Sequence, residues 1–336
     1  MNLAVKPRYK YIVILCPVVR TGGPEALHQL AAAISDLGGK VSMLYFLSTS
    51  TGHTHNTAVD TTQDKFILID PPKISGSLYD QYPVNQVTEF ALTDSTLVII
   101  PEAFATVVPM IPRVIKAVWW LSVDNSFLSN PNQLPNTYTS EFFKQHEILH
   151  FYQSEYAKNA LQLHGAKQRY ALSDYVNINV DTTGYIQPRD TIVYYPRKGK
   201  QLAETFKDRH NDLQFVPIEN MSRAQADQTL SQAGVYIDFG HHPGKDRVPR
   251  EAAQAGAVVL LRRAGSAKFF EDHPLTDEYF FTDTDVQNGN LYNKVKQILL
   301  NRSLHFDRQV QYRTTIALEK QKFYLEVSNI FFESYQ

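Results

Sequence analysis

The segment Val235–Leu261 holds the densest group of residues in the chain that could bind an anion. An apolar run, Val235–Asp238, leads into a polar loop with two glycines, and a short helix and a second apolar run, Ala257–Leu261, follow. The end of a strand, a glycine-containing loop and a helix N-terminus together form the usual anion site of an open α/β sheet. The candidate ligand-binding residues of this segment are Gly240, His241, His242, Lys245, Arg247, Arg250 and Glu251.

A second basic pair, Arg197 and Lys198, directly follows a predicted strand, Thr191–Tyr195. The forked guanidinium of arginine and the point charge of lysine suit a diphosphate. In a doubly wound sheet, the loops that follow neighbouring parallel strands converge on one crevice. We expect this pair to lie near Lys245 and Arg247, so that four cations offset an anion in a chain whose net charge is only -1. The alternative for the pair is a solvated basic turn.

The predicted helix after the loop carries an acidic residue, Glu251, just inside its N-terminus. This carboxylate either stabilises the helix dipole or accepts hydrogen bonds from ribose hydroxyls. Asp246 is the predicted N-cap, and Pro249 is tolerated in the first turn. The neighbouring His241 and His242 lack a carboxylate or a third ligand at the spacing of a metal site, so we expect no metal and prefer contact with a sugar or phosphate.

Three further places carry groups that could act on a ligand. Gly22, Gly23 and Glu25 follow the first predicted strand, where a helix N-terminus favours an anion, but the spacing is not the GxGxxG of a dinucleotide site. Asp124 follows another predicted strand, where it could serve as a general base toward an acceptor hydroxyl or close an Asx turn. Ser266 lies in a turn that could present backbone N–H groups at a helix start, or simply connect two elements.

The elements that must position these residues alternate between strand and helix patterns. Tyr11–Pro17 is a continuous apolar run, as in a central parallel strand, and a helix, Ala26–Leu37, and a strand, Val41–Phe46, complete one βαβ unit. Ser48–Thr62 is polar and predicts an exposed loop. Further predicted strands are Phe66–Ile69, Leu97–Pro101, Ala117–Leu121 and Leu149–Gln153.

A polar stretch, Asn177–Asp190, predicts a linker between two domains, because a second series of alternating strands and helices follows it. The tail, Asp307–Phe332, predicts one or two helices that return to the neighbouring domain. We therefore predict an α/β fold with two Rossmann-like domains facing across a cleft, residues 1–180 and 187–312. Residues 313–336 form a C-terminal helix that packs back on the first domain. A single large sheet is the alternative.

Composition excludes several classes of protein. The chain is 43% hydrophobic and 20% charged, which is typical of a globular protein rather than a disordered one. The balanced charge provides no global field that would recruit nucleic acid or anionic lipid. No apolar run approaches the ~20 residues of a membrane span. The single cysteine, Cys16, lies in an apolar run, which fits a reducing compartment. We expect a cytoplasmic protein with no nucleic-acid partner and at most peripheral contact with a membrane.

Three segments together resemble the GT-B glycosyltransferases, especially the family 4 type of bacterial surface polysaccharide synthesis. Gly22–Glu25, with its helix and the following Gly38–Val41, is similar to the first βαβ unit of that family. Gln153–Lys158 is similar to the segment before its interdomain linker. Arg250–Ala253 and Gly256–Val259 are similar to its nucleotide-binding helix and strand.

The resemblance implies that Glu251 binds the ribose of a nucleotide-sugar, that Arg197 and Lys198 lie near its diphosphate, and that the reaction needs no metal and no cofactor besides the donor. One departure is clear: the E-x7-E pattern of the family needs an acid at position 243, where this chain has Pro243. Asp124 and His242 are the catalytic candidates.

The leading hypothesis is therefore a glycosyltransferase that moves a sugar from a nucleotide-sugar to a glycan or lipid-linked acceptor in polysaccharide biosynthesis. Two alternatives remain. One is a sugar-nucleotide epimerase or hydrolase on the same scaffold, and the other is a non-catalytic protein that binds a nucleotide or glycan.

Overall fold

The computed structural model describes residues 5–47, 57–60, 64–68, 72, 79–126, 141–145, 147–177 and 189–334. The chain divides into two compact units, Met1–Asp174 with Gln321–Gln336, and Tyr175–Lys320. Among the described residues, every helix is too short or too polar to cross a membrane. The linker predicted at 177–190 lies mostly outside the described residues.

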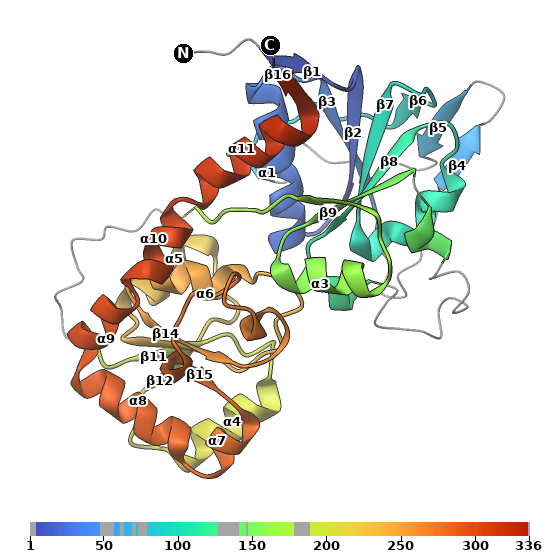
Figure 1. Ribbon diagram of the computed structural model, residues 1–336. Helices are drawn as coiled ribbons and strands as arrows, with labels where there is room; N and C mark the ends of the chain where they lie inside the picture. Colours follow the sequence, from blue (N-terminus) through green and yellow to red (C-terminus); the bar gives the residue numbers. More distant parts are fainter. Residues whose placement is uncertain are drawn as a thin grey trace. The chain divides into compact units, whose positions relative to one another are not determined.

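Unit 1 is built on a six-stranded sheet with the order β10-β9-β8-β7-β2-β3 (Figure 1). All five neighbouring pairs in this sheet are parallel. The continuous apolar runs explain the parallel pairing, because strands of a parallel sheet are covered on both faces. The strands are β2 (Tyr11–Pro17), β3 (Val41–Phe46), β7 (Thr96–Pro101), β8 (Ile115–Trp120), β9 (Ile148–Tyr152) and β10 (Gln168–Ala171).

The helices of unit 1 connect these strands. The first, α1 (Gly22–Asp36), follows β2 and packs on the sheet, and α3 (Glu155–Leu163) follows β9. The Oγ of Ser154 accepts a hydrogen bond from the backbone N–H of Ala157, so Ser154 is the N-cap of α3. Two 3-10 segments, η1 (Glu102–Met110) and η2 (Val123–Asn125), follow β7 and β8.

Two smaller sheets complete unit 1. β4 (Thr57–Asp60), β5 (Lys65–Leu68) and β6 (Glu89–Ala91) pair antiparallel, so the prediction of a loop over the whole of 48–62 is wrong at 57–60. The sequence pattern missed β4 because its polar residues, Thr57 and Asp60, match no apolar run. At the chain ends, β1 (Val5–Pro7) pairs antiparallel with β16 (Phe332–Ser334).

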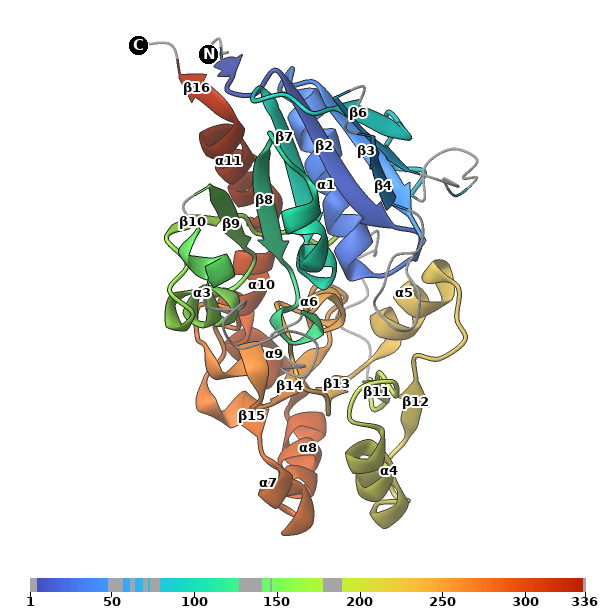
Figure 2. The same ribbon diagram turned by 90° about the vertical axis from the view of Figure 1, so that its right-hand side faces the viewer.

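Unit 2 has a five-stranded parallel sheet with the order β12-β11-β13-β14-β15. Figure 1 and Figure 2 show α5 and α6 on one face of this sheet and α4 and α8 on the other. The strands are β11 (Ile192–Tyr194), β12 (Phe215–Pro217), β13 (Val235–Asp238), β14 (Val258–Arg262) and β15 (Phe280–Phe281). Three of the helices are α4 (Lys200–Arg209), α5 (Arg223–Gln232) and α6 (Arg247–Gln254).

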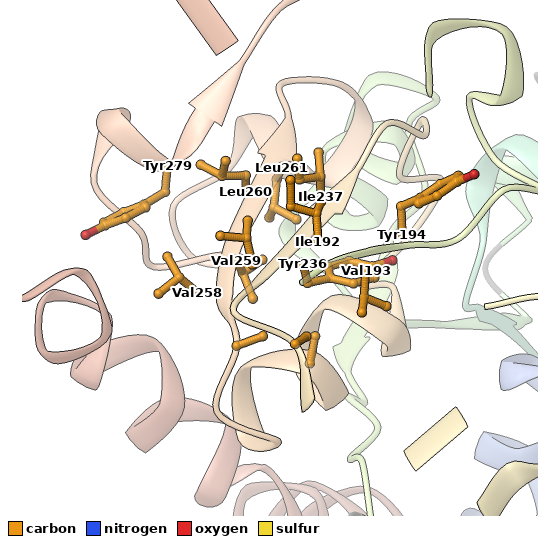
Figure 3. Packing of buried hydrophobic residues seen from close by; sticks show 14 of the residues in the cluster. Ile192, Val193, Tyr194, Tyr236, Ile237, Val258, Val259, Leu260, Leu261 and Tyr279 are labelled. Carbon is orange, nitrogen blue, oxygen red and sulfur yellow. The ribbon is translucent and has the colours of Figure 1, made fainter. Parts of the chain in front are cut away.

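The core of unit 2 lies between this sheet and its helices. Figure 3 shows side chains of β11, β13 and β14 packed together, among them Ile192, Ile237 and Leu260, each with 0% exposure. Burying one such aliphatic side chain contributes about 1.5–3 kcal/mol. The central strands that present the candidate site are therefore fixed by apolar packing rather than by the site's own polar contacts.

The last helices of unit 2 are α7 (Asp283–Gln287), α8 (Asn290–Leu300), α9 (Arg302–Arg308) and α10 (Val310–Ala317). The predicted return to the first domain begins at 313, but residues up to Lys320 belong to unit 2, because Tyr312 and Ile316 are buried in its core. The final helix, α11 (Glu319–Phe331), begins in unit 2 and continues into unit 1. Between Asp307 and Phe332 the tail forms two helices, α10 and α11, after the last residues of α9, as predicted.

Candidate functional site

Three loops of unit 2 meet at the carboxyl edge of its sheet. β11 and β13 are neighbouring parallel strands, and the chain continues from β11 to β12 on one side and from β13 to β14 on the other. This reversal of strand order is the topological switch point, where open α/β sheets bind their ligands. The loops after β11, β13 and β14 carry most of the candidate residues predicted from the sequence.

Glycines allow these loops to approach one another. At Gly199, φ is +66°, and a Cβ atom there would collide with the backbone carbonyl of Phe239. A Cβ at Gly240 would lie 2.7 Å from the Cβ of Lys198. At Gly265, φ is +57°, and a Cβ would collide with the carbonyl of His242. The loop after β13 is therefore in close backbone contact with the loops on both sides, which only glycine permits.

A network of four charged groups joins the first two loops. Lys198 Nζ lies 2.6 Å from Asp246 Oδ1, and His242 Nδ1 lies 2.9 Å from Asp246 Oδ2. Asp238 Oδ1 accepts the Gly240 N–H at 2.9 Å, and its Oδ2 accepts the Tyr236 hydroxyl at 3.1 Å. The predicted convergence of the two basic segments therefore occurs, but Lys198 is neutralised by a carboxylate that precedes α6.

The His242 imidazole is fully buried, with 0% exposure. Burial by itself lowers the pKa of His242, but the charges of Asp238 and Asp246 and the hydrogen bond that the imidazole donates to Asp246 outweigh it and raise the pKa above its ordinary value. The pKa of Asp246 is lowered, since the donors His242 and Lys198 outweigh the effect of its burial. The imidazole is held against the Asp246 carboxylate by its Nδ1, so this geometry favours a role in positioning Asp246 over the predicted catalytic role of His242.

The same side chains are the group among the described residues that most resembles a metal site. One ligand atom each from Asp238, His242 and Asp246 lies within 4.8 Å of the others. Each carboxylate oxygen of the two aspartates, however, already has a protein donor, and one of those donors is the Lys198 ammonium. At Asp246 these donors are the Lys198 ammonium and His242, so a divalent ion there would lie against a positive charge, and these residues do not favour a resident metal.

Lys245 and Arg250 contact a carboxylate that sequence reasoning missed. Glu319 Oε1 lies 2.6 Å from Lys245 Nζ, and its Oε2 lies 2.7 Å from Arg250 Nη1. The three side chains are 8%, 0% and 2% exposed for Lys245, Arg250 and Glu319. The structure therefore places both cations in the interior instead of toward a ligand. No local signal in the sequence points to Glu319, which lies at the start of the last helix.

Glu251 is held by two arginines. Its Oε1 accepts a hydrogen bond from Arg223 Nη1 at 2.8 Å and lies 3.6 Å from Arg247 Nε. Arg223 also contacts Asp227 at 2.9 Å, and Arg247 Nη1 donates to the carbonyl of Tyr175. Sequence reasoning missed Arg223. The available sequence signal was its position as the first residue of α5, directly after the capping-box residue Ser222. The predicted ribose-binding carboxylate is thus fixed in one orientation.

The N-terminus of α4 remains open to an anion. Its N-cap is Gly199 in the left-handed conformation, no side chain caps the helix, and its first turn holds no acidic residue. The first N–H groups of a helix of this length favour a phosphate or carboxylate. Arg197, in the loop just before α4, is exposed, and His241 is exposed on the loop after β13. These groups could contact an anionic ligand at the switch point.

Ser266 supports the loop after β13 instead of facing solvent. Its N–H donates to the His242 carbonyl at 2.9 Å, and its hydroxyl donates to the Gly244 carbonyl at 2.8 Å. The hydroxyl also lies 3.1 Å from Nε2 of His273, a second buried histidine. Burial lowers the pKa of His273 well below its ordinary value, so this imidazole is neutral. The backbone N–H of Ser266, which the sequence predicted could bind a ligand, is therefore bonded to the His242 carbonyl instead.

Unit 1 has its own switch point, between β2 and β7. Gly22 and Gly23 lie in the first turn of α1 rather than before it, and Glu25 is 9% exposed with its N–H bonded to the Thr21 carbonyl. Sequence reasoning missed Glu102, which follows β7 and accepts the Leu121 N–H at 3.1 Å. Burial raises the pKa of Glu102 to about 7. Its place directly after an apolar strand was the available signal.

Asp124 lies in η2, after β8, and is half-buried. The hydroxyl of Tyr156, from α3, donates to both of its carboxylate oxygens, at 3.0 and 3.1 Å. Burial and this carboxylate raise the pKa of Tyr156 to about 12. The aspartate therefore has a fixed orientation at the carboxyl edge of the sheet of unit 1.

Two Rossmann-like domains, each with a parallel sheet and a switch point, define the GT-B fold. Solved structures with this architecture match nearly the whole chain. Sucrose-phosphate synthase from Thermosynechococcus elongatus matches with a TM-score of 0.67 and 12% identity, over 96% of this chain and 98% of that chain. Anabaena HepE, in complex with UDP-glucose, matches with a TM-score of 0.62 and 12% identity, over 95% of this chain and 98% of that chain.

A third structure is TarM of S. aureus, in complex with Fondaparinux, alpha-GlcNAc-glycerol and UDP. It matches with a TM-score of 0.63 and 9% identity, over 95% of this chain and 99% of that chain. No protein-family model and no curated protein matches the sequence. The structural neighbours are GT-B glycosyltransferases, and the likeness establishes the fold of this chain.

Proposed function

We propose that this protein is a glycosyltransferase that binds a nucleotide-sugar at the switch point of unit 2. The observation that carries the proposal is the meeting of three glycine-containing loops at that edge, beside the open N-terminus of α4 and the exposed Arg197. The UDP and UDP-glucose in two structural neighbours support this class of ligand. The acceptor in this proposal is a glycan or lipid-linked sugar bound by unit 1, and the pathway is bacterial surface polysaccharide synthesis.

The reaction breaks the bond between the sugar anomeric carbon and a diphosphate oxygen and forms a bond between that carbon and the acceptor hydroxyl oxygen, which loses its proton. The negative charge that develops on the leaving diphosphate needs preorganised donors more than it needs mobile cations. The N–H groups of α4 and the Arg197 guanidinium supply them. The carboxylate of Glu251, fixed by Arg223 and Arg247, accepts hydrogen bonds from the ribose. Asp124, oriented by Tyr156, takes the proton of the acceptor hydroxyl.

The proposal includes a metal-independent reaction with no cofactor besides the donor. Its support is the network of Asp238, His242, Asp246 and Lys198, in which protein donors already satisfy the carboxylates. A cytoplasmic location, no nucleic-acid partner and at most peripheral membrane contact belong to the same proposal. A chelator should then leave turnover unchanged.

The test is a thermal-shift screen of the full chain against UDP-, GDP-, ADP-, dTDP- and CMP-sugars. A ligand at 100 times its Kd stabilises the folded state by about 2.7 kcal/mol, which is a readily measured shift. Arg197→Ala should abolish the shift by the matching donor. Arg209→Ala, an exposed arginine at the other end of α4, should leave it intact and serves as the matched control.

The outcomes separate the competing functions. Sugar transfer to an added glycan acceptor supports the proposal. Release of the nucleoside diphosphate with an altered or free sugar and no acceptor would instead indicate an epimerase or hydrolase. Binding without turnover of any donor would indicate a non-catalytic nucleotide-binding protein. If no nucleotide-sugar shifts the melting temperature of the wild-type protein, the proposed donor site is wrong.

A further inference from the structure

The loop after β13 is fastened by a buried ion triad that lies behind the proposed donor site. Glu319 lies between Lys245 and Arg250, with nitrogen–oxygen distances of 2.6 and 2.7 Å. All three side chains are at least nine-tenths buried. Two buried cations share one carboxylate, so removal of the carboxylate leaves two buried positive charges close together. The triad therefore depends on Glu319 more than on either cation.

Arg250 carries this constraint into the backbone of the loop. Its Nε donates to the Asp246 carbonyl at 3.1 Å, and its Nη2 donates to the Lys245 carbonyl at 2.8 Å. One guanidinium thus binds the two consecutive carbonyls that precede α6 and, through Nη1, the Glu319 carboxylate. Its planar, rigid fork fixes all three acceptors relative to one another. Any movement of Glu319 is therefore transmitted to the backbone at Asp246.

The segment that precedes Glu319 is held in place by contacts of its own. The Gln309 side chain, 1% exposed, donates to and accepts from the backbone of Val259 in β14, at 2.9 and 3.0 Å. The Gln254 amide of α6 donates to the Arg313 carbonyl of α10 at 2.7 Å. The segment that leads to Glu319 is therefore attached to the sheet and to α6 independently of the loop. Glu319 connects this rigid segment to the loop.

We infer that Glu319 is a positioning residue for donor binding, because it sets the backbone of the loop after β13, and that Lys245 and Arg250 serve this purpose instead of contacting the donor. The inference rests on the proposed function for its consequence in binding. The loop presents His241 and orients Asp246 against Lys198, beside the N-terminus of α4. A loop released by loss of Glu319 would sample other conformations, so the donor would have to order it on binding.

The experiment compares Glu319→Gln with Glu326→Gln in the full-length protein. Glu326 lies on the same helix, α11, and its Oε2 accepts hydrogen bonds from the N–H and hydroxyl of Ser173 in unit 1. Both substitutions thus remove a largely buried carboxylate from one helix, but only the first touches the loop. Hydrogen exchange of residues 239–247 and binding of UDP, GDP, ADP, dTDP and CDP are measured for each variant.

Exchange in 239–247 should become about tenfold faster in Glu319→Gln and stay unchanged in Glu326→Gln. The affinity for the nucleoside diphosphate that the wild type binds should fall about tenfold, with kcat at saturating donor much less affected. Glu319→Asp, which keeps the charge, should recover most of both losses. Unchanged exchange in a folded Glu319→Gln protein overturns the inference.

The role of Glu319 can still be tested if the variant does not fold or if the wild type binds no nucleotide. If Glu319→Gln does not fold, the triple variant Lys245→Met, Arg250→Met and Glu319→Leu removes every charge of the triad, which proteins often tolerate. Its loop carbonyls still lose the Arg250 donor, so fast exchange in 239–247 is again expected and slow exchange refutes the inference. If the wild type binds no nucleotide, the proposed function fails, but the exchange measurement still tests the role of Glu319 in ordering the loop.

Discussion

A pair of glycine substitutions tests whether the loops of unit 2 are as close as described. Gly199 and Gly289 both precede a helix, α4 and α8, as N-cap residues in the left-handed conformation, with φ of +66° and +85°. A Cβ at Gly289 would have no atom within 4 Å, whereas a Cβ at Gly199 would collide with the carbonyl of Phe239 and lie 3.0 Å from the Gly240 nitrogen. The two sites therefore differ in packing and share their backbone strain.

The expected magnitudes follow from these two contributions. Alanine in the left-handed region costs about 1–2 kcal/mol, and this cost applies to both Gly199→Ala and Gly289→Ala. Overpacking against neighbouring backbone adds about 1–3 kcal/mol at Gly199 alone. For a domain of 150–250 residues, the extra cost lowers the melting temperature by about 2–12 °C.

The assay is thermal unfolding of both variants beside the wild type, followed by a nucleoside diphosphate binding measurement at a temperature where all are folded. Gly199→Ala should melt lower than Gly289→Ala and bind the diphosphate more weakly, because the loop after β13 must shift. Equal melting temperatures for the two variants would refute the close approach of the loops. If Gly199→Ala is less stable than Gly289→Ala but binds the diphosphate equally well, the packing of the loops does not affect ligand binding.

Two further predictions concern unit 1. The pKa of Glu102 is raised by burial to about 7, above its unfolded value, so its contribution to stability is full at low pH and is lost as the pH rises from about 4.5 through about 7. Glu102→Gln should therefore be more stable than the wild type by a few kcal/mol above pH 7 and only slightly more stable at pH 4. A difference in melting temperature between the two proteins that stays constant from pH 4 to above pH 7 would contradict this. Ser154→Ala removes the N-cap of α3 and should cost about 1 kcal/mol in unfolding free energy, measured by urea titration. A loss below a tenth of that value would show that the cap does not stabilise the helix.

Much of the fold could be predicted from the sequence because parallel strands leave a strong signal. The runs at β2, β7 and β13 are continuously apolar, since both faces of these strands are covered. The short elements escaped prediction for the opposite reason. β10, for example, is largely exposed and has no apolar pattern, and its parallel pairing with β9 alone defines it.

The candidate site could be located from the sequence, but the partners of its charged groups could not. The strand-loop-helix pattern identified the loop after β13, and strand order then brought the loop after β11 beside it. What the sequence could not provide was which cations are already neutralised. Lys245 is paired with Glu319, 74 positions later, and such distant contacts depend on tertiary packing. Lys198 is also paired, with Asp246, so two of the four cations predicted to face an anion are already neutralised by carboxylates.

The division of the chain also bears on the order in which the protein can fold during synthesis. Unit 2 is one continuous segment, Tyr175–Lys320, inserted into unit 1, whose last part is Gln321–Gln336. β1 pairs with β16, and Asp36 accepts a hydrogen bond from the hydroxyl of Tyr324, and both partners are synthesised after the whole of unit 2. Domains of a nascent chain generally fold from the N-terminus onward. Here the second unit in the sequence can fold first, and the first unit is completed only after residues 321–336 have been synthesised.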